Sequence, residues 1–296
     1  MASRSNTRRV LQKSNSIPTR SDGVYPRVPP KPVALTIAGS DSGGCAGIQA
    51  DLETFAAFGL HGLAAVTAVT AQNTRRVRSI HRVPAREIEA QLMAVFDDFL
   101  VDAVKIGMLG SRAAVETVAA ALRRRRAVNV VIDPVLAASS GTALLPAAAM
   151  NSLRGELLPL AAVLTPNVPE AEALLARRIC SVSEMAGAAR DLLRFGARAV
   201  LLKGGHLPGA VVTDVLVEAG SAGARRFSRR RLPLAARGTG CTLAAAIAAG
   251  LALGLELNVA IARAERYLQA CLRRAYRTGA GKKYALEHLA KGAIER

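Results

Sequence analysis

The chain has 296 residues, of which 51% are hydrophobic and 21% are charged, and this is enough to bury the core of one large α/β domain. Its net charge of +18 raises the question of nucleic-acid binding. Only 3% of the residues are aromatic, none is Trp, and the basic clusters form no recognisable binding motif, so we expect no nucleic-acid partner.

Residues 1–32 differ in composition from the rest of the chain. They are rich in Ser, Arg, Asn and Pro, lack apolar periodicity, and carry seven basic residues against the single acid Asp22. Such a segment is expected to be a disordered basic tail. A transit peptide is one alternative, because such peptides are rich in Arg and Ser and poor in acids. A misassigned start is another.

From residue 33 onward, short apolar runs alternate with segments of helical periodicity. The expected strands cover 33–38, 63–70, 101–108, 128–135, 162–164 and 199–203, followed by two paired strands near an edge, 214–218 and 225–232. The expected helices cover 48–58, 85–100, a helix capped by Ser111 that runs to about residue 125, 182–195, 239–253 and 258–276. This alternation predicts a single domain over residues 33–296, with a mostly parallel central sheet and helices on both faces.

The cysteines and the most apolar predicted helix indicate the cellular compartment of the protein. Cys45, Cys180, Cys241 and Cys271 have neither zinc-type nor CxxC spacing, which indicates reduced thiols in a cytoplasmic protein. The apolar segment 243–253 is too short to span a bilayer, so we expect no membrane association.

Polar residues and glycines follow the predicted strands where each strand ends. Ligands of parallel sheets bind beyond these carboxyl ends. Six such clusters are hard to explain by packing, so we predict a ligand site there. The clusters are Gly39-Ser40-Asp41, Gln72-Asn73-Thr74, Gly107-Met108, Asp133-Pro134, Pro166-Asn167 and Lys203-Gly204-Gly205.

A glycine turn, Gly238-Thr239-Gly240, directly precedes the Ala-rich helix, and Cys241 follows it. Two glycines one residue apart let backbone N–H groups converge, and the helix adds the positive end of its dipole. Such a turn is suited to a phosphate. Alone, it could equally be a tight turn. With the strand-end clusters, it predicts a phosphoryl-transfer centre in a small-molecule kinase.

Taken together, seven motifs in order resemble the hydroxymethylpyrimidine and phosphomethylpyrimidine kinases of thiamine biosynthesis over residues 33 to 285. The motifs are Gly39 to Asp51, Thr70-Ala71-Gln72-Asn73-Thr74, Lys105-Ile106-Gly107-Met108-Leu109, Asp133-Pro134-Val135, Thr165-Pro166-Asn167-Val168-Pro169-Glu170-Ala171, Lys203-Gly204-Gly205-His206 and Gly238-Thr239-Gly240-Cys241-Thr242. The resemblance implies a three-layer ribokinase-like fold, ATP and Mg2+ as cofactors, a small pyrimidine as substrate, and a homodimer. A pyridoxal or pyridoxine kinase of the same fold is the nearest alternative. A catalytically silent sensor of the pyrimidine is another.

The same resemblance implies a role for each residue at a matching position. Around the pyrimidine ring it places Gln72, Gly39, Asp51, Thr70, Met108 and Val135. On the nucleotide phosphates it places Lys203, and near Mg2+, through waters, Glu170, Asp133 and Asn167. At the transferred phosphoryl group it places Gly238, Thr239 and Gly240, with Cys241 as the acceptor of the substrate's proton.

Each of four roles has a structural alternative. Gln72 is also compatible with a turn residue, Asp51 with a charge on a helix surface, Glu170 with an acid in the first turn of a helix, and Lys203 with a surface lysine. For Cys241 we expect a lowered pKa, because the thiol stands at a helix N-terminus.

Two positions depart from the family pattern. Arg237 stands where a His is usual, and is expected either to contact a phosphate or to face solvent. Cys45 stands where a glycine is common, and we interpret it as a packing residue. None of the four histidines has ligand spacing, although His206 is placed to line the nucleotide side.

Overall fold

The computed structural model describes residues 30–138 and 141–288. The predicted tail, apart from residues 30–32, lies outside this part, and so does the end of the predicted domain after residue 288. The strands are β1 (Val33–Asp41), β2 (His61–Gln72), β3 (Val77–Arg82), β4 (Ala103–Ile106), β5 (Val130–Ile132), β6 (Val163–Leu164), β7 (Ala199–Leu202), β8 (Val211–Glu218) and β9 (Arg225–Arg230). The helices are α1 (Gly47–Ala57), α2 (Ala85–Asp98), α3 (Arg112–Arg124), α4 (Met150–Ser152), α5 (Val168–Leu175), α6 (Val182–Leu193), α7 (Thr239–Ala252) and α8 (Leu257–Arg273).

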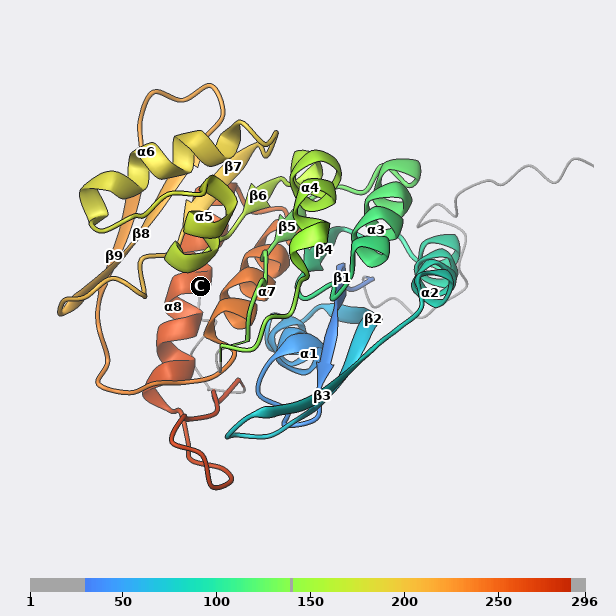
Figure 1. The fold of residues 1–296 in the computed structure, drawn as a ribbon, viewed down its shortest axis with the longest axis horizontal. Coiled ribbons are helices and arrows are strands. Elements are labelled where there is room, and N and C mark those ends of the chain that lie inside the picture. Colours follow the sequence, from blue (N-terminus) through green and yellow to red (C-terminus); the bar gives the residue numbers. More distant parts are fainter. Residues whose placement is uncertain (1–29, 139–140, 289–296) are drawn as a thin grey trace, which may run out of the picture.

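Within the described residues, nine strands form one sheet in the order β3-β2-β1-β4-β5-β6-β7-β8-β9 (Figure 1). The strands from β2 to β7 in this order run parallel. The edges are antiparallel, with β3 beside β2 at one end and β8 and β9 after β7 at the other. The predicted pairing of two late strands at an edge is confirmed.

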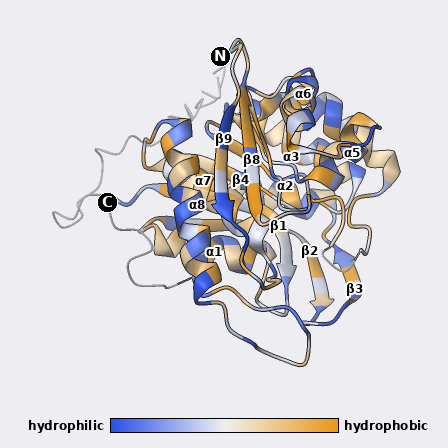
Figure 2. Cartoon of the chain, turned by 90° about the vertical axis from the view of Figure 1, so that its left-hand side faces the viewer, coloured by the Kyte–Doolittle hydropathy of each residue, from blue (hydrophilic) through white to orange (hydrophobic). Residues whose placement is uncertain are grey.

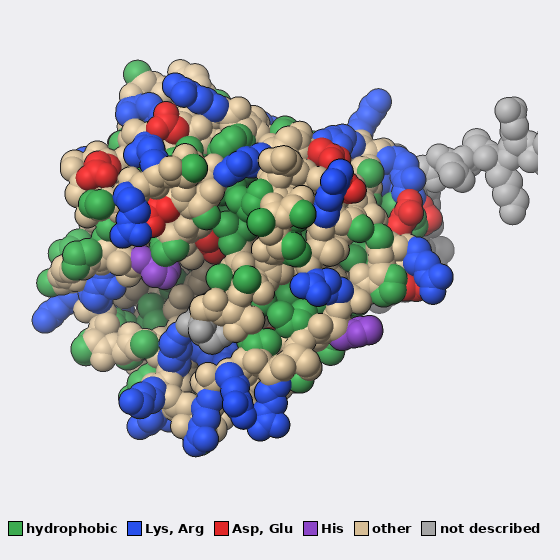
Figure 3. Space-filling view, viewed as in Figure 1, with side chains coloured by type: hydrophobic (Ala, Val, Ile, Leu, Met, Phe, Trp, Pro, Cys, Tyr) green, Lys and Arg blue, Asp and Glu red, His purple; other side chains and the backbone are tan. Residues whose placement is uncertain are grey.

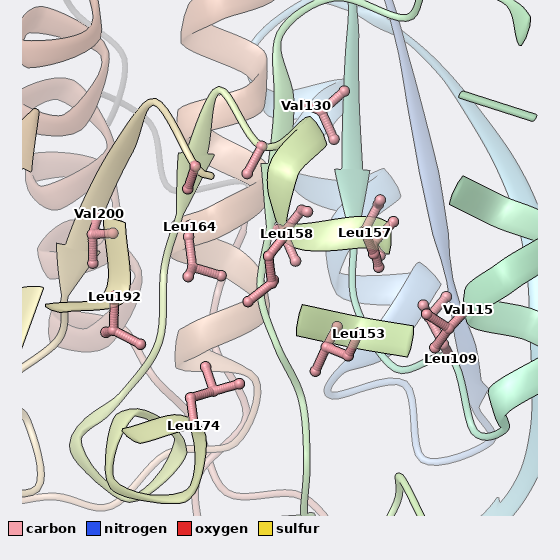
Figure 4. Packing of buried hydrophobic residues seen from close by; sticks show 14 of the residues in the cluster. Leu109, Val115, Val130, Leu153, Leu157, Leu158, Leu164, Leu174, Leu192 and Val200 are labelled. Atoms are coloured by element: carbon pink, nitrogen blue, oxygen red, sulfur yellow. The ribbon is translucent and has the colours of Figure 1, made fainter. Parts of the chain in front are cut away.

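Alternate residues of each central strand enter two separate cores, because successive side chains point to opposite faces of a sheet. In β1, Leu35 and Ile37 pack on one face, where α2, α3, α5 and α6 contribute, and Ala34 packs on the other with α1, α7 and α8. Figure 4 shows part of the first core, with Val130, Leu164 and Val200 from three strands beside leucines of the covering segments. The three-layer ribokinase-like architecture with both faces covered is therefore confirmed.

The strand β8 is buried over six residues, whereas β9 is the sheet's basic edge. Figure 2 shows this contrast as a hydrophobic β8 beside a hydrophilic β9. Charged edge strands discourage pairing with other chains, so the arginines of β9 need no ligand to explain them.

The order of the predicted elements holds, and Ser111 caps α3 by accepting a hydrogen bond from the N–H of Ala114 at 3.1 Å. Three elements were not anticipated, among them the three-residue helix α4. The edge strand β3 is mostly exposed, and its polar sequence has no strand periodicity. The helix α5 has only eight residues, too few to produce a clear helical pattern. None of the helices in the described ranges is long and apolar enough to cross a membrane.

Candidate active site

A cavity of about 1100 Å³ opens at the carboxyl ends of the parallel strands. Of the fourteen residues singled out from the sequence, thirteen line it, and Asp51 does not. These residues come from the carboxyl ends of β1 and β2, from the segments directly after β4, β5, β6 and β7, and from the turn that opens α7. The predicted residues therefore gather at the strand ends, and their roles in ligand binding stay predictions.

The turn before α7 is held open by its first glycine. Gly238 is the N-cap of α7 and has a φ of 73°, in the left-handed region. A Cβ at this position would lie 2.0 Å from the carbonyl oxygen of Cys45, so no other residue fits there without a shift of the backbone. The first N–H groups of a helix have no partner within it. Those of α7 face a cavity and can receive an anion.

Cys241 lies in the first turn of α7 and lines the cavity. Burial raises the pKa of its thiol to about 11; Lys105 and the Gly47 N–H oppose the rise, and Asp51 and Asp133 add to it. The expectation of a lowered pKa is therefore wrong, because the helix N-terminus does not offset burial among two carboxylates. The thiol is protonated at neutral pH in the ligand-free protein.

Beside the turn, Lys203 and Asp133 form a buried ion pair, with the Nζ atom 2.6 Å from Oδ1. Burial alone would lower the pKa of Lys203, but Asp133 and Glu170 raise it above its usual value. The ammonium therefore stays charged. An ideal Cβ built at Gly240 would lie 3.2 Å from Nζ and 3.5 Å from Asp133 Oδ2, which places the turn against the pair. Lys203 is thus no surface lysine.

Glu170 and Asn167 form a capping box at the start of α5. The Asn167 side chain accepts from the Glu170 N–H at 2.9 Å, and the Glu170 carboxylate accepts from the Asn167 N–H at 2.8 Å. Glu170 thus has the first-turn role considered as its alternative, and it also lines the cavity. Burial and the nearby Asp133 raise the pKa of Glu170 to about 7, against the effect of Lys203.

The part of the cavity around Gln72 and Thr70 is otherwise lined largely by apolar side chains. Met108 and Leu144 form a small core with Ala68, against which Val135 packs. The backbone of Gln72 is fixed by Ser42, whose hydroxyl accepts from its N–H at 2.9 Å and donates to its carbonyl oxygen at 2.8 Å. Among the described residues, the side-chain amide of Gln72 has no hydrogen-bond partner. Its donor and acceptor are available to a ligand.

Asp51 is fully buried beneath this floor, so it is neither a surface charge nor a wall of the cavity. Its Oδ2 accepts from Thr36 Oγ1 at 2.6 Å and from Lys105 Nζ at 2.8 Å. Burial raises the pKa of Asp51, although Lys105 and Thr36 lower it. Lys105, fully buried as well, is the member of the pair that lines the cavity. The prediction that Asp51 lies around the ring is therefore corrected: Asp51 lies behind Lys105 and does not reach the cavity.

Arg237 does not face solvent, since it is buried and bonded to protein groups. It lines the cavity, and its contact with a phosphate stays a prediction. Its Nη2 lies 3.3 Å from Asp41 Oδ2, and its Nη1 donates to the carbonyl oxygen of Asn73. Asp41 in turn accepts from the N–H groups of Gly43 and Cys45, which orders the first loop. Arg237 therefore joins the first loop and the β2–β3 turn to the phosphate turn. Cys45 is buried, in line with a packing role.

The two glycines after Lys203 differ sharply in their surroundings. Gly204 donates its N–H to Asp214 Oδ1 at 2.8 Å, and a Cβ on it would lie 2.1 Å from the Thr213 carbonyl oxygen. Gly205 has nothing within 4 Å of its Cβ position.

We expect Gly204→Ala to displace the Lys203 loop, to lower the free energy of unfolding by about 1–3 kcal/mol and to reduce kcat/KM. Gly205→Ala is the matched control and should change stability by no more than about 0.5 kcal/mol. Urea unfolding and steady-state kinetics of both variants check this. Equal behaviour of the two would contradict the close packing of Gly204.

Sequence reasoning missed Lys105, Asp41 and the pairing role of Arg237. Lys105 sits inside the apolar strand β4, where a buried lysine needs a buried acid. That signal was available, because Asp51 had already been placed on a helix next to the first strand. Asp41 was quoted within a motif but given no role.

A protein family described as phosphomethylpyrimidine kinase matches residues 41–285. A hydroxymethylpyrimidine/phosphomethylpyrimidine kinase of Rhizobium meliloti is 49% identical over 252 residues, covering 84% of this chain and 93% of that protein. The thiamine biosynthesis bifunctional protein ThiED of Geobacter sulfurreducens is also 49% identical over 252 residues, which are 85% of this chain and only 51% of the bifunctional protein.

Solved structures agree with the fold. The phosphomethylpyrimidine kinase of Clostridium difficile superposes with a TM-score of 0.73 and 39% identity, covering 82% of this chain and all of that one. The pyridoxal kinase of Staphylococcus aureus, solved with AMP-PCP and pyridoxal, gives a TM-score of 0.80 at 28% identity and covers 89% of this chain and 95% of its own.

Proposed function

The chain belongs to the phosphomethylpyrimidine kinase family, and on this basis we propose that it is an ATP-dependent kinase of thiamine biosynthesis. It phosphorylates 4-amino-5-hydroxymethyl-2-methylpyrimidine and then converts the monophosphate to the diphosphate. One observation carries the proposal for this chain. A single cavity has an unpaired amide, Gln72, at its apolar end and a charged lysine, Lys203, beside a phosphate-type turn at the other. Its volume suits two substrates held together.

The residues divide the work of phosphoryl transfer, which is mainly positioning and neutralisation of charge. The side chain of Gln72 pairs with the aminopyrimidine edge, and Gly39, Thr70, Met108 and Val135 enclose the ring. Lys203 meets the nucleotide phosphates. The N–H groups of Gly238, Thr239 and Gly240 hold the transferred phosphoryl group as it gains negative charge.

The two transfers differ in their need for a base. In the first, the hydroxymethyl oxygen attacks the γ-phosphorus of ATP, the bond from that phosphorus to its bridging oxygen breaks, and ADP leaves. The proton of the hydroxyl group passes to the Cys241 sulfur. In the second, a phosphate oxygen attacks, which is already anionic and needs no base. Because the thiol has a raised pKa, only its small thiolate fraction can take the proton in the first step.

The donor set fits Mg2+. Asp133 Oδ1 pairs with Lys203 and one Glu170 oxygen accepts from Asn167, so each carboxylate keeps one oxygen without a hydrogen bond among the described residues. Mg2+ needs only one or two carboxylates beside substrate phosphates and waters. No cluster of three or more His, Cys, Asp or Glu exists in residues 30–138 and 141–288 that could hold a metal without such help. Asp133 and Glu170 would hold the ion, and Asn167 orients Glu170. When bound, Mg2+ neutralises charge on the phosphates.

We expect Glu170→Gln to raise the Mg2+ concentration at half-maximal rate by about 10- to 100-fold. The amide keeps an acceptor for the Asn167 N–H, so the helix cap and the Tm should persist. Glu172→Gln is the matched control, since Glu172 lies on the same helix but does not line the cavity. Titration of the activity of each variant with Mg2+ measures this concentration. An unchanged Mg2+ requirement in Glu170→Gln would show that Glu170 does not hold the metal.

Three further proposals accompany this function. Residues 33–296 act as a single kinase domain. The protein works as a homodimer, as its resemblance to the family implies. It works in the cytoplasm, where ATP is its phosphate donor. Light scattering of the purified chain tests the dimer, and a monomer at working concentrations would overturn it.

The test of function is ATP consumption with Mg2+ by the purified protein, offered the hydroxymethylpyrimidine and pyridoxal in parallel, with the products resolved by mass. Mono- and diphosphorylated pyrimidine support the proposal. A pyridoxal kinase is the second candidate, favoured by the 0.80 TM-score against the S. aureus enzyme. Pyridoxal phosphate as the only product would establish that candidate. No phosphorylation of either would contradict both.

A further inference from the structure

Four cations line the mouth of the cavity and take no part in the mechanism above. Arg75 and Arg76 belong to the turn between β2 and β3, and Lys282 and Lys283 to the segment after α8. We call these four residues the basic rim. Figure 3 shows Lys and Arg side chains gathered along the lower edge of the molecule, where Figure 1 places that turn and that segment.

The two halves of the rim are bonded to each other although they are some 200 residues apart in the chain. Thr74 Oγ1 accepts from the Gly281 N–H at 2.9 Å, and Arg75 Nε lies 3.4 Å from the Ala280 carbonyl oxygen. Asn73 Oδ1 accepts from the N–H groups of Arg75 and Arg76 at 2.9 and 3.0 Å, which shapes the turn. The rim is thus a built structure, with its cations held on one side of the opening.

The segment after α8 is also fixed to the phosphate turn. The Arg237 N–H donates to the Tyr284 carbonyl oxygen at 2.9 Å, and the Tyr284 N–H donates to Ala235 at 2.9 Å. Lys282 and Lys283 immediately precede this anchor. The rim therefore has a defined position relative to the N-terminus of α7.

Among the described residues, no acid on the cavity wall forms an ion pair with Arg75, Arg76 or Lys282. The three carboxylates that line the cavity are engaged elsewhere: Asp41 with Arg237, Asp133 with Lys203, and Glu170 in its helix cap. Arg76 and Lys282 form no ion pair within the described ranges.

We propose that the basic rim is a second phosphate-binding site, distinct from Lys203 and the Gly238–Gly240 turn, which holds a phosphate group of a ligand already seated in the cavity. The inference rests on the proposed function. Two sources supply such a group: the monophosphate substrate of the second transfer and the triphosphate of ATP. The uncharged hydroxymethylpyrimidine has no phosphate group that the rim could bind. The rim thereby favours phosphorylated over unphosphorylated ligands.

The test compares two double variants, Arg75→Ala/Arg76→Ala and Lys282→Ala/Lys283→Ala, with the parent. The matched control is Arg225→Ala/Arg226→Ala, which removes two adjacent exposed arginines of β9 that do not line the cavity. Calorimetry measures the Kd of the hydroxymethylpyrimidine, its monophosphate and AMP-PCP, each at 0.05 and 0.5 M NaCl. Circular dichroism and Tm verify that each variant is folded.

We expect the rim variants to bind a phosphorylated ligand about tenfold more weakly at low salt, and high salt to shrink the difference, since exposed charges are screened. Affinity for the hydroxymethylpyrimidine should stay within twofold. Loss confined to the monophosphate assigns the site to the pyrimidine phosphate, and loss confined to AMP-PCP assigns it to the nucleotide. Unchanged affinity for both, or an equal loss in the β9 control, overturns the proposal.

The outcomes also separate the rim from the proposed function. If the parent protein binds AMP-PCP but not the pyrimidine or its monophosphate, the proposed substrate is wrong. The affinities of the rim variants for AMP-PCP then test the proposed phosphate site by themselves. If the parent binds all three ligands and the rim variants bind them equally well, the proposed function is supported and the proposed phosphate site at the rim is wrong.

Discussion

Replacing Cys241 with alanine is expected to lower kcat of the first phosphoryl transfer by about 10²- to 10⁴-fold, the usual contribution of a positioned general base. The Kd of the hydroxymethylpyrimidine should change little, because the sulfur meets only the reacting oxygen. The second transfer should be far less affected, since its nucleophile is already an anion. Separate assays starting from the alcohol and from the monophosphate measure the difference.

The pH dependence follows from the raised pKa of the thiol. At a pKa of about 11, the thiolate fraction grows roughly tenfold for each unit of pH through the neutral range. The rate of the first transfer in the parent should therefore rise with pH between 6 and 9. In Cys241→Ala this rise should disappear. Cys180→Ala, at an exposed free cysteine, is the control. Equal turnover in parent and Cys241→Ala would take the thiol out of the mechanism.

The second large effect is on stability and concerns the ion pair below the cavity. We expect Asp51→Asn to lower the free energy of unfolding by about 3–5 kcal/mol, because it leaves the Lys105 ammonium buried without its counter-charge. Both side chains are fully buried, so water cannot replace the lost partner. Urea denaturation followed by circular dichroism measures the change.

The design of this experiment isolates the charge. The double variant Asp51→Asn/Lys105→Met should lose less than the sum of its two single changes, because no charge remains buried. The matched control is Arg86→Met, which removes a cation from the exposed Arg86–Glu87 pair and should cost less than about 1 kcal/mol. A loss in Asp51→Asn no larger than in this control would mean that the buried pair does not stabilise the fold.

Most of the fold could be predicted from the sequence because the central strands are apolar runs buried on both faces. Such runs differ clearly from the helices between them. The strand β3 escaped prediction, since an edge strand with exposed polar side chains resembles a loop. The helix α5 escaped because its stability comes from the Asn167–Glu170 cap and from packing, and it is too short to display a pattern.

The site was predictable where position along a strand determines direction. Residues at the carboxyl ends of parallel strands must meet at one edge, and nine of the thirteen predicted residues that line the cavity lie there. Asp51 was not predictable in this way, because the rotation of α1 against the sheet decides whether its acid reaches the cavity or Lys105. The pKa of Cys241 was misjudged for a related reason. A helix N-terminus is visible in the sequence, but the burial of the thiol and the two acids near it depend on tertiary structure.

The anchoring of Tyr284 between Ala235 and Arg237 has a consequence for biosynthesis. Translation releases the strands β1 to β7 and their helices long before residues 276–286 leave the ribosome, and domains begin to fold as their chain emerges. The sheet can therefore be assembled while one wall of the cavity is still missing. A nascent or truncated chain that ends before residue 276 would hold its central strands yet lack part of the enclosure, so the part of the cavity wall that carries Lys282 and Lys283 is added last.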